Sequence, residues 1–282
     1  MKQGILNGVA RLVTTALGLF GRRKQAIAQA ILSDAFLPVW RQPVAGGVIL
    51  FYGQGLKPVL RGQTLLTKEP ETIAWLDGMS EADRLWDVGG NIGVYSLYAA
   101  HQRGVRVYAF EPEASNFAVL CRNIAINKLD DRITAFCIAL TEQAGVDVLN
   151  VAHLVAGASS TQFGHTVDQL GRPFTPAMRQ GCFGFPIDEL ISVHGFEPPT
   201  HIKIDVDGLE PAILAGAERT LADPTLKSIL VEAVEEQADG RRQIEDVLAR
   251  HGFRRDSYSR GNHIFVRGGD AATKGAQKES SD

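Results

Sequence analysis

The feature that most constrains the fold is a glycine-rich turn at 87–93, which stands between a short run at 84–86 and a helical pattern. A second apolar run, 105–110, follows this helix and ends in Glu111. Glycines allow a sharp bend because they adopt positive φ angles at no steric cost. We therefore predict a βαβ unit with an acidic residue, Asp87 or Glu111, at the tip of each strand.

The same turn indicates what kind of ligand it binds. Nucleotides bind at the carboxyl ends of parallel strands, and a dinucleotide site needs the GxGxxG spacing and a helix N-terminus free for pyrophosphate. The glycine spacing differs here, and Asp87 would repel phosphate. S-adenosylmethionine (SAM) has an ammonium and a sulfonium group but no phosphate. We predict that Asp87 serves the ammonium, directly or through water, and that Glu111 serves the ribose hydroxyls. An ordinary glycine turn with Asp87 as a helix cap is the alternative.

Length and composition indicate one large α/β domain with additions. The chain has 282 residues, of which 45% are hydrophobic and 22% charged, and its formal net charge is -3. No basic face stands out, so we expect no nucleic-acid partner. Cys121, Cys137 and Cys182 form no CxxC pair, which argues against structural zinc and a disulfide framework. Free thiols are typical of a reducing compartment, and we expect a cytoplasmic protein.

The N-terminal segment has the pattern of an amphipathic helix. Apolar residues recur at helical spacing over 5–20, Arg11 interrupts them, and the basic cluster 22–24 follows. The apolar stretch is too short to span a bilayer. The sequence at 28–30 resembles a signal-peptidase site, but the basic cluster precedes it, where a signal peptide should be neutral. This helix could pack on the domain, contact a second subunit, or lie on a membrane surface.

Strands and helices alternate over most of the chain, which predicts a doubly wound, mostly parallel sheet with helices on both faces. A closing hairpin adds an antiparallel C-terminal edge strand. We expect an extension over 1–66 with a hairpin near 48–52, a main domain over 67–267, and a disordered tail over 268–282. The predicted strands are 84–88, 105–110, 133–139, 201–206, 227–233, 253–257 and 262–267. The predicted helices are 92–102, 114–127, 187–194, 209–221 and 240–251.

The alternation breaks over 142–186, which is rich in glycine, proline and small polar residues. A loop of this length inside a compact domain is usually functional or disordered. Because it follows the third strand, we interpret it as a lid over the substrate. His165 lies in this lid and is a candidate general base, although a lone histidine is more often structural.

Carboxylates gather where the strand at 201–206 ends. Asp205 would point into the cleft, where it could take a proton from an acceptor hydroxyl or position the acceptor. Asp207 and Glu210 fit the N-terminus of the following helix. Magnesium could bind such oxygens, but the sequence places no third partner, so we predict no metal site. Glu232 ends the next strand and is a further candidate for contact with substrate.

Five segments, in this order, resemble the FkbM family of SAM-dependent methyltransferases. They are 67–72, 86–96, 109–112, 123–127 and 203–210, and the resemblance covers roughly 65–266. It implies a class I, Rossmann-like methyltransferase fold and transfer of a methyl group, commonly to an oxygen of a sugar or natural product. It also implies that Asp87, Gly89, Asn91 and Glu111 meet SAM, and that Glu71 reaches the methionine end of SAM.

The expected SAM site is completed by neighbours of these residues in the turn and at the second and third strand ends. They are Gly90, Gly93, Pro112, Ala139 and Leu140. Two residues depart from the family pattern. Gly90 stands where the family usually has alanine, and Asp207 stands where it often has glutamate.

The sequence predicts an O-methyltransferase whose partner is a small-molecule or glycan acceptor. It lacks a GxSxG elbow, an HExxH motif and a P-loop, which hydrolases and kinases would need. Two alternatives remain. One is methylation of a nitrogen or of a lipid-linked glycan, and the other is a SAM-binding protein without activity. Fold alone does not fix the acceptor.

Overall fold

The computed structural model describes residues 3–19, 21–159, 161–168, 170–233, 238–259 and 261–268. The chain divides into two compact units at Val39, and each is described by itself. The first unit holds two helices, α1 (Gln3–Gly18) and α2 (Arg22–Ala35). The second begins at Trp40, so residues 40–66 fold with the rest of the chain and not with the N-terminal helices. The tail from residue 269 lies outside the described residues.

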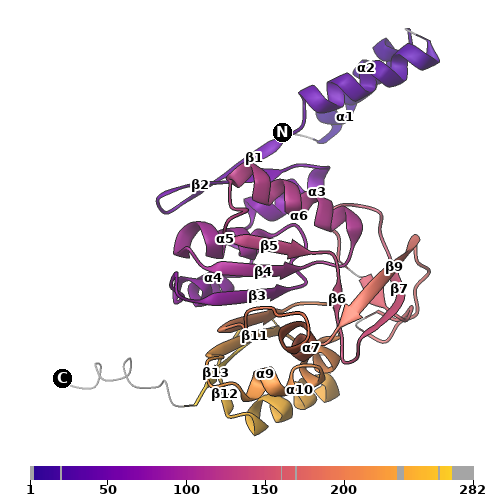
Figure 1. Ribbon diagram of the computed structural model, residues 1–282. Helices are drawn as coiled ribbons and strands as arrows, with labels where there is room; N and C mark the ends of the chain where they lie inside the picture. The colour runs from indigo at the N-terminus through magenta and orange to yellow at the C-terminus, as the bar shows by residue number, and fades with distance from the viewer. Residues whose placement is uncertain are drawn as a thin grey trace, which may run out of the picture. The chain divides into compact units, whose positions relative to one another are not determined.

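A seven-stranded sheet forms the centre of the second unit (Figure 1). The strand order is β12-β13-β11-β10-β3-β4-β5, and neighbours pair in parallel except β13, which is antiparallel to both β11 and β12. The predicted mostly parallel sheet with an antiparallel C-terminal hairpin is confirmed. The strands are β3 (Arg84–Val88), β4 (Arg106–Phe110), β5 (Ile133–Phe136), β10 (His201–Ile204), β11 (Ser228–Glu232), β12 (Phe253–Ser259) and β13 (Asn262–Arg267).

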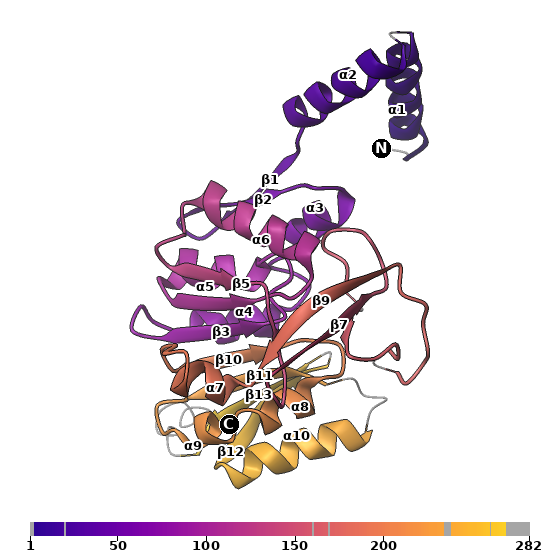
Figure 2. The ribbon, with the colours of Figure 1, turned by 45° about the vertical axis from the view of Figure 1, so that its right-hand side comes forward.

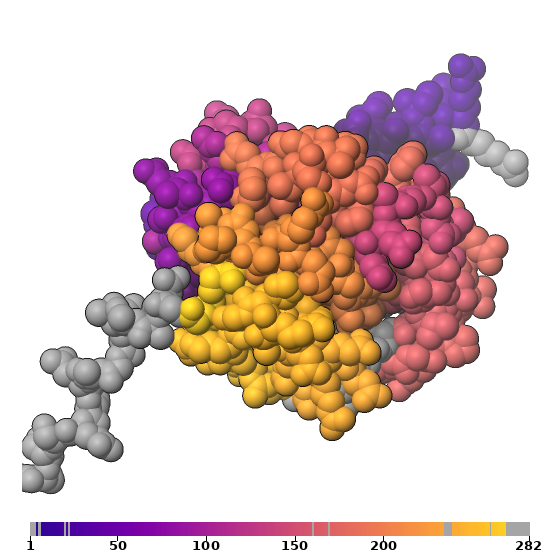
Figure 3. Space-filling view, turned by 60° about the horizontal axis from the view of Figure 1, so that its bottom comes forward, coloured from indigo at the N-terminus to yellow at the C-terminus, as the bar shows by residue number. Residues whose placement is uncertain are grey.

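Helices cover both faces of this sheet because successive strand residues point to opposite faces. Leu85 packs in one apolar cluster with α4 to α6, while Trp86 packs in another with α7 to α10 (Figure 2). The yellow C-terminal elements lie beside the orange segment of α7 to α9 in Figure 3. The helices are α3 (Leu56–Gln63), α4 (Pro70–Asp77), α5 (Val94–Arg103), α6 (Ala114–Asn127), α7 (Ile187–Ser192), α8 (Glu210–Ala215), α9 (Glu218–Ala222) and α10 (Ala238–Arg250).

The hairpin expected near 48–52 is also present. It consists of β1 (Val39–Val44) and β2 (Gly47–Tyr52), which form a separate two-stranded sheet. Two asparagines of α6 hold β2. The Leu50 backbone N–H donates to Asn127 Oδ1 at 2.8 Å, and the Tyr52 N–H donates to Asn123 Oδ1 at 2.7 Å. These bonds satisfy the edge of β2 and fix it against the main domain.

The segment 142–186 is not a long loop, as the sequence suggested, because it contains strands of a second sheet. The order in this sheet is β6-β9-β7-β8. Its strands are β6 (Ala139–Leu140), β7 (Gly145–Val151), β8 (Thr161–Phe163) and β9 (Met178–Phe185). The sequence did not predict β9 because it contains glycines at 181 and 184, and glycine is rare in strands. The strand predicted at 133–139 therefore ends at Phe136, and Ala139 joins the second sheet.

One further difference concerns a helix. The helix predicted at 209–221 is two helices, because α8 ends at Ala215 with Gly216 as its C-cap and α9 begins at Glu218. The backbone at Gly216 lies against the carbonyl oxygen of Thr141 and leaves no room for a side chain. The other predicted elements of the main sheet and its helices agree with the structure within two residues at each end. Within the described ranges, no helix has the length and apolarity needed to cross a bilayer.

Candidate functional site

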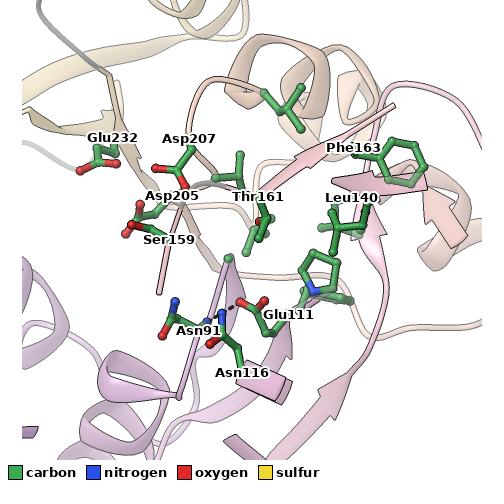
Figure 4. A pocket seen from close by; sticks show the side chains of 18 of the residues that line it. Asn91, Glu111, Asn116, Leu140, Ser159, Thr161, Phe163, Asp205, Asp207 and Glu232 are labelled. Carbon is green, nitrogen blue, oxygen red and sulfur yellow. Dashed lines mark hydrogen bonds between the residues drawn. The ribbon is translucent and has the colours of Figure 1, made fainter. Parts of the chain in front are cut away.

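A cavity of about 260 Å³ lies at the carboxyl ends of β3, β4, β10 and β11. The loop after β3, the β4 tip and the second sheet surround it. Figure 4 shows Glu111 with Asn91 and Asn116 on one side, and Asp205, Asp207 and Glu232 on another. This is where ligands bind in open parallel sheets. Of the predicted site residues, the structure brings Gly89, Asn91, Glu111, Pro112, Ala139, Leu140, Asp205 and Glu232 to the cavity wall.

Gly89 forms part of the cavity floor, and no other residue type fits there. Its φ is +81°, and a Cβ atom would collide with the backbone oxygen of Asp205. Gly93 has φ +85° and packs against Leu120, so it shapes the turn behind the cavity wall. At Gly90 a Cβ atom would meet nothing closer than Ala109 Cβ, at 3.6 Å. The turn therefore requires glycine at two positions and has room for alanine at the third.

Glu111 ties the glycine turn to the end of β4. Its Oε2 accepts a hydrogen bond from the Asn91 backbone N–H at 2.8 Å, and its Oε1 accepts one from the Glu113 N–H at 2.9 Å. The residue is 4% exposed, and burial raises the pKa of its carboxyl group to about 7. Each carboxylate oxygen has a second acceptor site. Glu111 can therefore hold two vicinal hydroxyls at the cavity wall.

The Asp87 side chain does not border the cavity. Its side chain is buried between β3 and α5, outside the cavity wall, where its Oδ2 accepts a hydrogen bond from Ser96 Oγ at 2.5 Å. Burial raises the pKa of this carboxyl group, and among the described residues its Oδ1 has no hydrogen-bond partner. The reason is strand geometry, since Asp87 is the last residue but one of β3 and its side chain points to the α5 face.

Lys203 is a residue that the sequence reasoning missed. It is 1% exposed within β10, and its Nζ lies 2.8 Å from Asp205 Oδ2 and 5.2 Å from the centroid of the Tyr95 ring. Asp205, Asp87 and Glu69 surround the ammonium and raise its pKa despite burial. The sequence did contain a signal for this residue. Strands of a sheet that is covered on both faces are normally apolar, so a lysine inside the four-residue strand β10 is unusual and indicates a buried charge.

Asp205 and Glu232 form a carboxyl pair whose pKa values are shifted in opposite directions. Burial raises the pKa of Asp205, but the nearby Lys203 ammonium outweighs it and leaves that pKa well below the usual range. The negative charge of Asp205, together with burial, raises the pKa of Glu232 to about 9. Asp205 is therefore the ionised partner, and Glu232 is a neutral acid that can donate a hydrogen bond.

Two predicted residues lie outside the cavity. His165 is exposed, and its imidazole does not border the cavity. Glu71 accepts a hydrogen bond from Asn262 Nδ2 at 3.3 Å, on the β13 side of α4. Its neighbour Lys68 reaches the cavity and pairs with the buried Glu69 at 2.6 Å. Pro70 starts α4 just after Glu69, so Glu69 and Glu71 lie on different sides of the chain.

Part of the segment expected to form a lid closes one side of the cavity. The carbonyl oxygen of Ala158 accepts hydrogen bonds from Asn91 Nδ2 at 2.8 Å and Asn116 Nδ2 at 3.1 Å. The Gly157 N–H donates to Asn116 Oδ1 at 2.7 Å, and its carbonyl oxygen accepts from Arg61 Nε at 2.6 Å. The sequence did not single out Asn116 or Arg61, since nothing local links α6 or α3 to this turn.

The turn after β10 also differs from expectation. Asp207 adopts φ +60° and borders the cavity, so it is not the helix cap. The N-cap of α8 is Leu209, and Glu210 lies in the first turn of the helix. Its Oε1 holds the preceding turn, because it accepts hydrogen bonds from the Val206 N–H at 3.2 Å and the Gly208 N–H at 3.1 Å. Across the described ranges, no three histidine, cysteine, aspartate or glutamate side chains are arranged to hold a metal ion.

The strand order, the glycine turn after β3 and the acidic residue after β4 define a class I methyltransferase. The sequence profile of the FkbM methyltransferase domain matches residues 87–255, and the chain belongs to that family. The predicted family is thereby confirmed. The chain is a methyltransferase.

Two relatives and one solved structure illustrate this similarity. Hexuronic acid methyltransferase AglP of Haloferax volcanii is 24% identical over 181 residues, covering 63% of this chain and 68% of the relative. The 31-O-demethyl-FK506 methyltransferase FkbM of Streptomyces tacrolimicus is 27% identical over 194 residues, covering 61% and 72%. The FkbM methyltransferase structure from Methylobacillus flagellatus superposes with a TM-score of 0.47 at 18% identity. That match covers 74% of this chain and about half, 53%, of the other.

Proposed function

We propose that this methyltransferase uses SAM to methylate a hydroxyl oxygen of a sugar or natural-product acceptor. One observation carries the proposal. A single cavity brings together the bare backbone of Gly89, the carboxylate of Glu111, and the Asp205–Glu232 pair. Two relatives, named for a hexuronic acid and for 31-O-demethyl-FK506, support an oxygen acceptor.

The residues of the cavity fit SAM chemically. Glu111 offers acceptors for the ribose hydroxyls, and Gly89 leaves room for close approach of the methionine part. Leu140 and Phe163 offer an apolar surface suited to the adenine ring. The ionised carboxylate of Asp205 provides negative charge that suits a sulfonium. Bound SAM would supply an electrophilic methyl group on this sulfonium.

Asp205 acts on the acceptor in this proposal. Its carboxylate accepts the hydrogen bond of the attacking hydroxyl and so fixes the direction of the oxygen lone pair. The depressed pKa of Asp205 makes it a weak base, so it takes the proton only as the oxygen becomes strongly acidic through methylation. Glu232, protonated at neutral pH, donates a hydrogen bond to the Asp205 carboxylate and holds its orientation.

The strands and turns of 142–186 form the acceptor-facing lid in this proposal. Thr161 and Phe163 border the cavity, and the Ala158 carbonyl is hydrogen-bonded to the glycine turn through Asn91. Excluding water there would protect the methyl donor and strengthen the interaction of Asp205 with the acceptor. The cytoplasm remains the location we expect for such an enzyme.

Titration with S-adenosylhomocysteine (SAH), with NAD as control, tests the donor. Micromolar binding of SAH alone is the expected result, and no binding by a folded sample would contradict SAM as donor. Labelled SAM with a panel of glycosides and hydroxylated natural products tests the acceptor. Transfer to amines but not to hydroxyls would favour a nitrogen acceptor. SAH binding without transfer to any acceptor, including cell extract and lipid-linked glycans, would favour a SAM-binding protein without activity.

A further inference from the structure

The described side chains of the N-terminal unit, α1 with α2, form no hydrophobic core. Among its described side chains, none is buried. Helices of 16 and 14 residues are marginally stable in water without packing of an apolar face. The unit therefore needs a surface outside itself to stabilise its helices.

The apolar side chains of the unit lie at helical spacing and are exposed. On α1 they include Val9, Leu12 and Val13, with Leu12 72% exposed. On α2 they include Ile27 and Ile31, with Ile31 62% exposed. Spacings of three and four residues place each set along one side of its helix. Each helix thus offers an apolar stripe with polar residues such as Thr15 and Ser33 elsewhere.

The net charge of the N-terminal unit indicates which kind of partner its apolar stripes bind. Residues 1–39 contain five lysines and arginines and a single acidic residue, Asp34, for a net charge of +4. The remaining 24 basic and 31 acidic residues give the rest of the chain a net charge of -7. An apolar stripe beside concentrated positive charge is typical of helices that lie in the interface of an anionic membrane. A subunit contact between two copies would bring these positive charges together.

We propose that α1 and α2 bind the surface of a membrane that contains anionic lipids, with their apolar stripes in the headgroup region. The helices lie on the bilayer and do not cross it, in keeping with the absence of a span among the described helices. The enzyme would then work next to a lipid surface. This inference does not depend on the identity of the methyl acceptor.

Vesicle flotation of the full-length protein tests the inference. We expect at least about tenfold more protein on phosphatidylcholine vesicles that contain phosphatidylglycerol than on phosphatidylcholine alone. The variant Leu12→Gln/Ile31→Gln removes the apolar stripes without changing charge and should lose at least about tenfold of the binding. The control Thr15→Gln/Ser33→Gln changes one polar residue on each helix and should bind within about twofold of wild type. Arg23→Gln/Lys24→Gln should weaken binding by about fivefold for each charge removed.

Light scattering without lipid separates this proposal from self-association. A monomer that floats only with anionic vesicles, and loses flotation in the Leu12→Gln/Ile31→Gln variant, supports it. A dimer that the same variant converts to monomer, without vesicle binding, would overturn it in favour of a contact between copies. The proposal would also be overturned if the protein bound no vesicles, or if it bound neutral and anionic vesicles equally well. SAH binding serves as the check that the second unit is folded in each variant.

Discussion

The Lys203 ammonium and the Asp205 carboxylate form a contact of 2.8 Å beneath the cavity, although Lys203 is 1% exposed. Asp205 borders the cavity, whereas Lys203 lies in the interior with Asp87 and Glu69 around it. A buried lysine thus compensates the carboxylates on which the site depends. This arrangement links the stability of the fold to the charge of the site.

Replacing Lys203 with methionine should destabilise the protein strongly. The variant leaves buried carboxylates without a counter-charge, and we expect a loss of about 3–5 kcal/mol in urea unfolding near neutral pH. Without the ammonium, Asp205 would have a raised pKa in the folded state. Stability from such a group is present when it is protonated and is lost as pH rises, so the deficit should be smaller near pH 5 than near pH 8.

Lys227 offers a matched control, since its ammonium contacts Asp83 at 2.6 Å but its side chain is half-exposed. Lys227→Met should cost at most about 1 kcal/mol. Equal losses in the two methionine variants would show that Lys203 does not balance the charges of the site.

Alanine at two adjacent glycines should have opposite effects. Gly89→Ala forces a side chain into the Asp205 backbone at φ +81°, so SAH binding should be lost and the melting temperature lowered. Gly90→Ala has room, and by restricting the unfolded chain it should stabilise the protein by about 0.4–1 kcal/mol. Its SAH affinity should stay within about twofold. Calorimetry and thermal melting measure both, and a binding loss at Gly90 as large as at Gly89 would contradict this geometry.

Glu111 and Asp87, the two acidic residues of the βαβ unit, should differ in their importance for binding. Glu111→Gln removes charge-assisted acceptors at the cavity wall, so SAH affinity should fall by about 10- to 100-fold. Asp87→Asn keeps the shape of a side chain that lies outside the cavity wall, and SAH affinity should change by less than about threefold. Calorimetric titration of both variants with SAH measures the two changes in affinity. A larger loss at Asp87 would show that this carboxyl group reaches the ligand after all.

The neutral acid Glu232 should make SAM binding proton-linked. Its pKa is raised to about 9, and a sulfonium nearby would favour its ionised form. SAM binding near pH 8 should therefore release up to about one proton more than binding of SAH, whose sulfur is uncharged. Calorimetry in buffers of different ionisation enthalpy measures this difference. Glu232→Gln should abolish it, whereas equal proton release for SAM and SAH in the wild type would argue against a sulfonium beside this pair.

The sequence indicated the elements whose signals are local. The turn at 87–93, the strand tips at Glu111 and Asp205, and the alternation of strands and helices are all read from neighbouring residues. The second sheet was missed because Gly181 and Gly184 weaken the strand signal, and pairing partners far along the chain outweigh such preferences. The sequence did not predict to which face of the sheet the Asp87 side chain points. That face depends on the residue at which β3 ends, since successive strand residues point to opposite faces.

The sequence by itself thus determined the fold class, the family and the tips of the strands where ligands bind. Only the tertiary structure decided which carboxylates face the cavity and which are buried behind it. It also brought Lys203 beneath Asp205, and Asn116 and Arg61 against the turn at 157–158. These relationships join residues far apart in the chain, and their charges and hydrogen bonds depend on burial, which no local pattern specifies.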